Sequence, residues 1–228
     1  MKTSVDLRSR FKRWGLEPRA QGARGTCSVF AMVGAIEYAV ARRLRKGIRL
    51  SAEYLNWAGH RATGRTADGG FFSEIWQGFE TYGICPEELM PYSADYNPAM
   101  EPSPQAKEQA KRFKSLGLKL HWIKEWDVRT GATEEQLLTI KRVLQHGFPV
   151  SGGFRWHKVE KWVNGVLQMC PPEEVFDGHS VLLVGYRDDA KQPGGGVFFI
   201  FNSGSSEREA MIPYEYVRTY LNDAVWIE

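Results

Sequence analysis

One of the three cysteines lies where a Gly-rich loop meets the start of a helix-like segment. The loop has the sequence QGARGT at residues 21–26, and Cys27 follows it directly. The first turn of a helix has unpaired backbone N–H groups and a partial positive charge, both of which favour a thiolate over a thiol. Cys27 is therefore a candidate nucleophile, although a cysteine among apolar residues is more often a small core residue.

Two further polar residues lie at the ends of apolar, strand-like runs in the second half of the chain. His179 precedes the run 180–186, and Asn202 ends the run 197–202. If these strands are antiparallel neighbours, the Asn side chain can bind one imidazole nitrogen and leave the other facing a thiol. Each residue alone would be structural, but the order Cys, His, Asn indicates nucleophilic catalysis.

The first half of the chain is expected to supply helices that position these groups. Apolar residues recur at helical spacing over about 26–47, and basic residues occupy the last turn. A second helix is expected from Ser51, and a third over about 72–82. A capping box at Thr133 predicts a fourth helix. Residues 86–104, with five prolines, are expected to form a loop.

The second half of the chain changes to short β-rich runs, which Gly, Pro and Asp residues separate. These runs cover residues 148–154, 180–186, 197–202 and 224–227. Helices followed by strands predict an α+β fold, with a helical lobe packed against a β lobe. A cleft between two such lobes is the expected place for a functional site.

Composition excludes several other classes of protein. The 228 residues are 43% apolar and 25% charged, which fits one large globular domain or two closely packed lobes. A net charge of +3 is too small to indicate binding of nucleic acid. The longest apolar runs are strand-sized, so no membrane span is expected. The cysteines and histidines show no metal-ligand spacing, so neither a metal nor another cofactor is expected.

The start of the chain carries charged residues and no apolar stretch of the kind that a secretory signal contains. A cytoplasmic location is therefore expected, with secretion by another route left open. The odd number of cysteines and the absence of a CxxC motif also argue against a disulfide scaffold.

Taken in order, these motifs resemble those of the papain family of cysteine peptidases, family C1. Residues 21–31 are similar to its Q-G-x-x-G-x-C-x-x-F-A block, and Asp68-Gly69-Gly70 is similar to its N-G-G. About 150 residues separate Cys27 from His179, an interval typical of papain. Further matches complete the series: VDLR at 5–8, LSAE at 50–53, YGI at 82–84, PY at 91–92, PVS at 149–151 and FNS at 201–203.

The resemblance covers nearly the whole chain and implies a single papain-like domain over residues 1–228. An N-terminal helical lobe would take up about 20–105. A C-terminal antiparallel β lobe would take up about 106–228 together with the N-terminal strand. The active site would lie in the cleft between the two lobes.

The resemblance also implies roles for individual residues. Cys27 would be the nucleophile that forms a thioester acyl-enzyme, and His179 its general base and later its acid. Asn202 would orient the imidazole, while the Gln21 amide and the Cys27 backbone N–H would form the oxyanion hole. The substrate backbone would be bound at glycines, where missing side chains permit a close approach: Gly69, Gly70, Gly153 and Gly178.

The chain departs from the family pattern at two tryptophan positions. The family stretch C-G-S-C-W is RGTCS here at 24–28, so its first cysteine and its tryptophan are both absent. The family stretch N-S-W-G is NSGS here at 202–205, so the tryptophan that shields the Asn–His contact is absent too. That contact is therefore expected to be open to water unless Trp156, Trp162 or another aromatic residue covers it.

Two other departures concern disulfides and a propeptide. With Cys85 and Cys170 as the only other cysteines, none of the family's usual disulfides can be assembled. Only twenty residues precede Gln21, so the resemblance is to a bacterial-type member without an inhibitory propeptide, with a pro-region outside this sequence left open.

The expected function is hydrolysis of peptide bonds by a cysteine-type endopeptidase that acts on a polypeptide substrate as a monomer. Two alternatives stay open. One is acyl transfer by an amidase or transpeptidase at the same site, and the other is a papain-fold binding protein that has lost activity. Neither nucleic acid nor a membrane is expected as a partner, and a protein inhibitor or regulator stays open.

Overall fold

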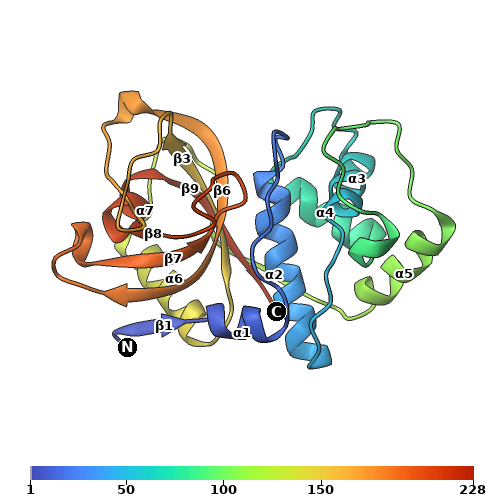
Figure 1. The fold of residues 1–228 in the computed structure, drawn as a ribbon, viewed down its shortest axis with the longest axis horizontal. Helices are drawn as coiled ribbons and strands as arrows, with labels where there is room; N and C mark the ends of the chain where they lie inside the picture. Colours follow the sequence, from blue (N-terminus) through green and yellow to red (C-terminus); the bar gives the residue numbers. More distant parts are fainter. Residues whose placement is uncertain (1) are drawn as a thin grey trace.

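The central helix α2 (Cys27–Leu44) lies between a large sheet and a layer of helices (Figure 1). This computed structural model describes residues 2–228, except the side chain of Asp177. Helix α2 is buried on several sides, with Val29, Met32 and Ile36 all fully inaccessible. A helix that is apolar around most of its circumference is stable only when other elements cover it. The predicted first helix is therefore the element on which both lobes pack.

The helical lobe contains α3 (Ala52–Thr63), α4 (Phe72–Tyr82) and α5 (Pro104–Lys114). Ser51 caps α3 by accepting a hydrogen bond from the Tyr54 N–H at 2.9 Å, as the sequence pattern predicts. Helix α5 was not predicted, because only Ala106, Ala110 and Phe113 among its residues are apolar and buried. It packs against α4 and extends the helical lobe to Lys114, beyond the expected boundary near residue 105.

The other lobe is built on one sheet with the strand order β2-β9-β3-β6-β7-β8-β5-β4, and β1 also pairs with β6. All described pairs are antiparallel except β5 with β8. In chain order the strands are β1 (Ser4–Asp6), β2 (Leu120–Lys124), β3 (Val150–His157), β4 (Trp162–Val163), β5 (Val166–Leu167), β6 (Val175–Asp188), β7 (Gly196–Phe201), β8 (Glu209–Pro213) and β9 (Leu221–Ile227). The predicted α+β fold and the four predicted strands are present, whereas β2, β4, β5 and β8 were missed.

The remaining helices are α1 (Arg8–Arg13), α6 (Glu134–Gln145) and α7 (Tyr214–Tyr220). Three short 3-10 turns complete the elements, at Glu87–Leu89, Pro172–Glu174 and Pro193–Gly195. The predicted capping box begins α6, since the Thr133 hydroxyl accepts from the Gln136 N–H at 3.2 Å. The N-terminal strand β1 pairs with β6, so the start of the chain is part of the sheet.

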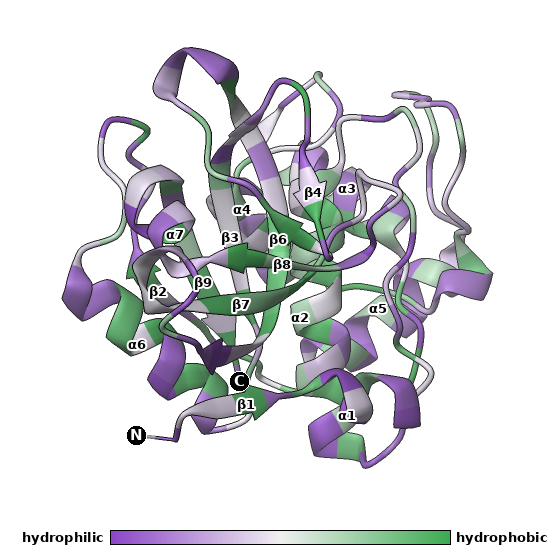
Figure 2. Cartoon of the chain, turned by 60° about the vertical axis from the view of Figure 1, so that its left-hand side comes forward, coloured by the Kyte–Doolittle hydropathy of each residue, from purple (hydrophilic) through white to green (hydrophobic). Residues whose placement is uncertain are grey.

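The main core lies between α2 and the sheet. Strand β7 and the middle of β6 are apolar, as their colour in Figure 2 shows. A side chain at Gly34 of α2 would lie only 2.8 Å from Leu182 of β6, so helix and sheet are in close contact. A smaller apolar cluster packs α3 against α5 and includes Tyr54, Cys85 and Ala110. The catalytic candidates on α2 and β6 are thus held by one continuous core.

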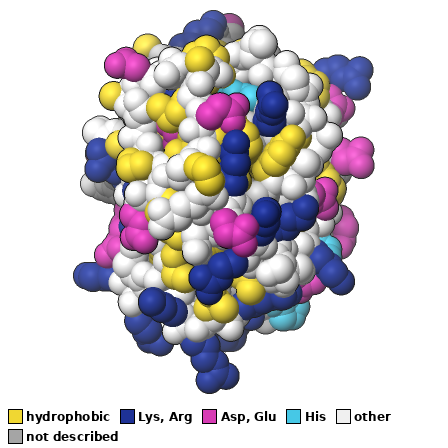
Figure 3. All heavy atoms as spheres, turned by 90° about the vertical axis from the view of Figure 1, so that its right-hand side faces the viewer, with side chains coloured by type: hydrophobic (Ala, Val, Ile, Leu, Met, Phe, Trp, Pro, Cys, Tyr) yellow, Lys and Arg dark blue, Asp and Glu magenta, His cyan; other side chains and the backbone are white. Residues whose placement is uncertain are grey.

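The outer face of the helical lobe carries charges of both signs, with Lys and Arg side chains gathered toward its lower end (Figure 3). Part of the basic run that ends α2 has a structural role. Arg42 and Arg43 donate to the carbonyls of Gly147 and Leu116, which lie outside the helix. Within residues 2–228, no helix has the length and apolar character needed to cross a bilayer.

Helices α3 and α4 approach so closely that one glycine becomes essential to their contact. A Cβ added at Gly78 would lie 2.6 Å from the Cα of Gly59, against backbone that cannot move aside. We expect Gly78→Ala to lower the free energy of unfolding by about 1–3 kcal/mol through overpacking. Urea denaturation measures this change.

The matched control is Gln77→Ala, one residue away on the exposed side of α4. It introduces the same residue with no contact to α3, so we expect a change within about 0.5 kcal/mol. Equal stabilities of the Gly78→Ala protein and the parent would contradict the close packing described above.

Candidate active site

Cys27 is the first residue of α2, and its side chain is half-buried. Its Sγ lies 3.9 Å from the carbonyl oxygen of Gly178, the residue before His179. Burial opposes ionisation of the thiol, but the hydrogen bond with His179, the charge of His179 and the N–H groups of Ser180 and Ser28 hold its pKa below the usual value. The helix terminus and the histidine therefore favour the thiolate together.

His179 on β6 contacts Asn202 at the end of β7. The Nε2 of His179 donates to the Oδ1 of Asn202 at 2.8 Å, and Asn202 is fully buried. The register that pairs Leu182 with Phe201 brings the two residues together. Burial favours the neutral imidazole, but its contacts with Cys27 and Asn202 and the charge of Glu160 raise the pKa of His179 above the usual value. A lowered thiol pKa and a raised imidazole pKa favour a thiolate–imidazolium pair.

The contact between His179 and Asn202 is covered, even though the family's tryptophan is absent. The Trp156 ring on β3 lies 4.8 Å from the His179 ring, centroid to centroid. The backbone of Gly204 lies on another side, because a Cβ there would be 2.8 Å from the His179 Cε1. His179 is consequently only 8% exposed. The sequence left open whether the contact between His179 and Asn202 is exposed to water or covered by an aromatic residue. In the structure, Trp156 covers it.

Gln21 is held beside the same group of residues. Its Nε2 donates to the carbonyl of Arg24 at 2.8 Å, and its Oε1 accepts from the Ser203 hydroxyl at 2.8 Å. Its Oε1 would also lie 3.2 Å from a Cβ at Gly204, on the same side as His179. The Tyr92 hydroxyl donates to the Gln21 carbonyl at 2.9 Å and so fixes the loop. The amide is therefore oriented before any substrate binds.

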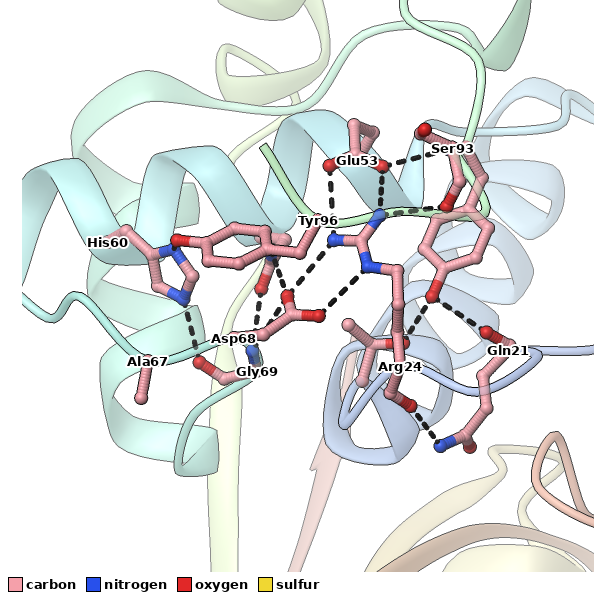
Figure 4. Close-up of polar contacts among 12 residues, drawn as sticks. Gln21, Arg24, Glu53, His60, Ala67, Asp68, Gly69, Ser93 and Tyr96 are labelled. Atoms are coloured by element: carbon pink, nitrogen blue, oxygen red, sulfur yellow. Dashed lines mark hydrogen bonds and ion pairs between the residues drawn. The ribbon is translucent and has the colours of Figure 1, made fainter. Parts of the chain in front are cut away.

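A buried arginine, Arg24, connects this loop to neighbouring segments of the helical lobe (Figure 4). The Arg24 guanidinium contacts Glu53 at 2.6 and 3.1 Å, Asp68 at 2.9 and 3.0 Å, and the Ser93 carbonyl at 3.0 Å. These contacts use all five of its N–H donors. Its side chain is only 4% exposed. Arg24 stands where the family has its first cysteine, and its ion pair with Asp68 ties the Gln21 loop to the segment around Asp68.

Gly69 differs from the other three glycines that were expected to bind substrate. The N–H of Gly69 donates to the Asn56 Oδ1 at 3.1 Å, and its carbonyl accepts from the His60 Nε2 at 2.8 Å (Figure 4). The Tyr96 hydroxyl in turn contacts the His60 Nδ1 at 3.0 Å. The N–H and the carbonyl of Gly69 therefore both make hydrogen bonds within the protein. These bonds hold in place the segment that borders the site.

Gly70, Gly153 and Gly178 line a cleft of about 170 Å³ that also contains Cys27 and His179. The Gly70 carbonyl is fixed by the hydroxyl of Ser28, the residue after Cys27, which donates to it at 2.6 Å. Three of the four predicted glycines thus face the space next to the thiol. A bound chain can approach closest where these side chains are missing.

Sequence reasoning missed several residues of the cleft, above all Asp223 on β9. A Cβ at Gly153 would overlap the Oδ1 of Asp223, so the glycine makes room for this carboxyl group. Burial raises the pKa of Asp223 to about 7, against the opposing effects of Lys124 and the Gly153 N–H. The rings of Phe71 and Trp126, 5.6 Å apart, also line the cleft. These residues carry no local motif, because only the folded sheet brings β9 next to β3.

The other two cysteines lie in different surroundings. Cys85 is buried, and burial raises the pKa of its thiol to about 12. Burial and the neighbouring Glu174 raise the pKa of Cys170 as well. All three cysteines are free. Cys27 therefore differs from both of the others in the direction of its pKa shift. Among residues 2–228, no three His, Cys, Asp or Glu side chains gather as metal ligands would.

We expect Arg24→Met to lower the free energy of unfolding by about 3–5 kcal/mol, because it leaves two carboxylates in the interior without their cation. Chemical denaturation near pH 7 measures this loss. The control is Arg129→Met, which removes an exposed arginine paired with Asp127 and should have little effect.

The cluster also predicts a pH dependence of stability. Burial opposes ionisation of Asp68, but the hydrogen bond and charge of Arg24 lower its pKa below the usual value. A lowered folded-state pKa stabilises the protein above the unfolded-state pKa, and this contribution is lost as pH falls below about 4. We expect the Tm of the parent to fall more steeply below pH 4 than that of Arg24→Met. Parallel curves would contradict this role of Asp68.

Comparison with known proteins identifies the family of the chain. The family described as "Papain family cysteine protease" matches residues 1–207. Cysteine proteinase 3 of Solanum lycopersicum is 26% identical over 171 residues, which cover 74% of this chain and 44% of that protein. The chain therefore spans less than half the length of this curated relative.

Solved structures of cysteine proteases have the same fold. Xylellain of Xylella fastidiosa superposes with a TM-score of 0.76 at 22% identity, over 100% of this chain and 86% of that one. Digestive procathepsin L 3 of Tenebrio molitor gives a TM-score of 0.69 at 19% identity, over 99% of this chain and 69% of that one. These similarities confirm the predicted papain-like α+β fold. With the family match over most of its length, the chain belongs to the papain family of cysteine proteases.

Proposed function

We propose that the protein hydrolyses peptide bonds in polypeptide substrates, with Cys27 as nucleophile. The observation that carries this proposal is the pairing of Cys27, at the start of α2, with His179, whose Nε2 is bound 2.8 Å from Asn202. Because Nε2 is occupied, Nδ1 is the ring nitrogen left for the thiol. The arrangement supports a thiolate–imidazolium pair at neutral pH.

The reaction follows from the positions of these groups. The Cys27 thiolate attacks the carbonyl carbon of the scissile bond, and the imidazolium of His179 protonates the leaving amine. The C–N bond breaks and a thioester remains on Cys27. His179, now neutral, takes a proton from water, and the resulting attack on the thioester releases the acid and regenerates the thiolate. Asn202 keeps the ring in one orientation through both steps.

The oxyanion of the tetrahedral intermediate requires hydrogen-bond donors placed beforehand. The Gln21 amide is held by Arg24 and Ser203, and one of its two N–H groups is used by the Arg24 carbonyl. We assign its second N–H, together with the backbone N–H of Cys27, to the oxyanion.

Two alternatives use the same fold. A binding protein without activity was supported by the absent tryptophans, but Trp156 covers His179 and the polar groups are all in place. Acyl transfer uses the same thioester and differs only in the acceptor. Product analysis with a peptide library distinguishes hydrolysis from transfer, because transfer yields ligated products.

The reactive thiol gives the most direct test. We expect brief treatment with iodoacetamide at pH 7 to label Cys27 before Cys85 and Cys170, since only Cys27 has a lowered pKa. Mass spectrometry of tryptic peptides locates the label. We also expect Cys27→Ala to abolish peptide hydrolysis, whereas Cys170→Ala retains it. Faster labelling of Cys85 or Cys170, or hydrolysis by Cys27→Ala, would refute the proposal.

The role of Gln21 is tested by kinetics. We expect Gln21→Ala to lower kcat about 100- to 1,000-fold with little change in KM, because the amide binds charge that develops only in the transition state. Initial rates over a range of substrate concentrations separate the two constants. A rise in KM at constant kcat would instead make Gln21 a substrate-positioning residue.

A further inference from the structure

Glu160 lies outside every motif of the sequence, on the connection between β3 and β4, yet its carboxylate is bound on several sides. It accepts hydrogen bonds from the Trp156 Nε1 at 2.8 Å, the Trp162 Nε1 at 2.9 Å and the Ser205 hydroxyl at 2.7 Å. Burial opposes its ionisation, but these donors and the nearby charge of His179 hold the pKa of Glu160 below its usual value. At neutral pH the group is therefore a carboxylate.

The donors to Glu160 belong to the two segments that cover His179. Trp156 packs its ring 4.8 Å from the imidazole. Ser205 follows Gly204, whose backbone lies against the His179 Cε1 and whose N–H donates to the Asn202 Oδ1 at 3.1 Å. One carboxylate thus ties strand β3 to the segment after β7, on the side where the family has a tryptophan.

The charged groups around the imidazole come from different elements. Cys27 on α2 is its thiolate partner, and the Glu160 carboxylate acts on it from the connection after β3. Arg65 and Asp68 of the helical lobe and Asp223 on β9 line the cleft beside it. Asn202 after β7 is neutral. Of the acidic side chains named here, Glu160 is the one bound directly to a ring that packs on His179.

We propose that Glu160 is a positioning residue for His179, which clamps Trp156 and Ser205 over the imidazole and keeps a negative charge beside it. The proposal rests on the proposed function in treating His179 as the partner of Cys27. Loss of the charge destabilises the imidazolium, so the imidazole loses its proton at lower pH. Because hydrolysis needs the imidazolium to protonate the leaving amine, the alkaline limb of the pH–rate profile moves with it.

The test compares the parent with Glu160→Gln, which keeps the shape of the side chain and an acceptor oxygen but removes the charge. The pKa of His179 is measured by NMR titration of its ring protons, assigned by their loss in His179→Asn. We expect the pKa of His179 to be lower in Glu160→Gln than in the parent. Glu160→Asp, which restores the charge, should recover most of the parent value.

The same titration in a Cys27→Ala background removes the thiolate, and the shift caused by Glu160→Gln should persist there. This arm requires no activity, so a parent without hydrolysis would refute the proposed function while the shift still supports the role of Glu160. If the parent is active, the alkaline limb of the pH profile of kcat/KM should move to lower pH in Glu160→Gln, together with the pKa of His179.

The matched control is Glu174→Gln, which removes an exposed carboxylate of the same lobe that pairs with Lys161 at 3.6 Å. It should leave the pKa of His179 unchanged. A lower Tm of Glu160→Gln with an unchanged pKa of His179 would show that Glu160 only holds the indole rings in place. That result would overturn the proposal.

Discussion

The thiol of Cys27 and the imidazole of His179 can act together only if a helix end and a strand meet at one point. The helix supplies unpaired N–H groups that favour the thiolate, and the strand supplies a ring held by Asn202. Much of the remaining structure follows from this requirement. Helix α2 is apolar around most of its circumference, and its Gly34 lies close to Leu182 of β6. These contacts fix the helix on the sheet, so the packing of the core sets the distance between the two lobes.

Around Cys27 and His179, charged side chains make the contacts at two places where the family has a cysteine and a tryptophan. Arg24 stands where the family has a cysteine and joins the loop that carries Gln21 to Glu53, Asp68 and Ser93 through five hydrogen bonds. Glu160 binds the residues that cover His179 where the family has a tryptophan. Arg24 and Glu160 are charged groups whose hydrogen-bonding atoms nearly all have partners. Under this condition a buried charge stabilises one arrangement of its neighbours. Their loss would leave neighbouring groups without partners.

Local patterns in the sequence were sufficient for the long, strongly periodic elements. The helix that starts at Cys27, the capping box of α6 and the strands of His179 and Asn202 were all predicted, because each has its own periodicity or cap. Helices α1, α5 and α7 and strands β2, β4, β5 and β8 were missed. Helix α5 contains few apolar residues, α1 and α7 have only six and seven residues, and none of the four strands is longer than five residues, which is too short for a clear periodicity.

The sequence by itself determined the order of the candidate site residues, since Gln21, Cys27, His179 and Asn202 occur in motifs that a linear pattern can show. Only the tertiary structure decided what surrounds them. Trp156 covers the imidazole, Asp223 occupies the space left by Gly153, and Gly69 faces inward. The reason is that contacts between β3, β9 and the segment after β7 join residues far apart in the chain. Such contacts depend on register and packing, which no local spacing records.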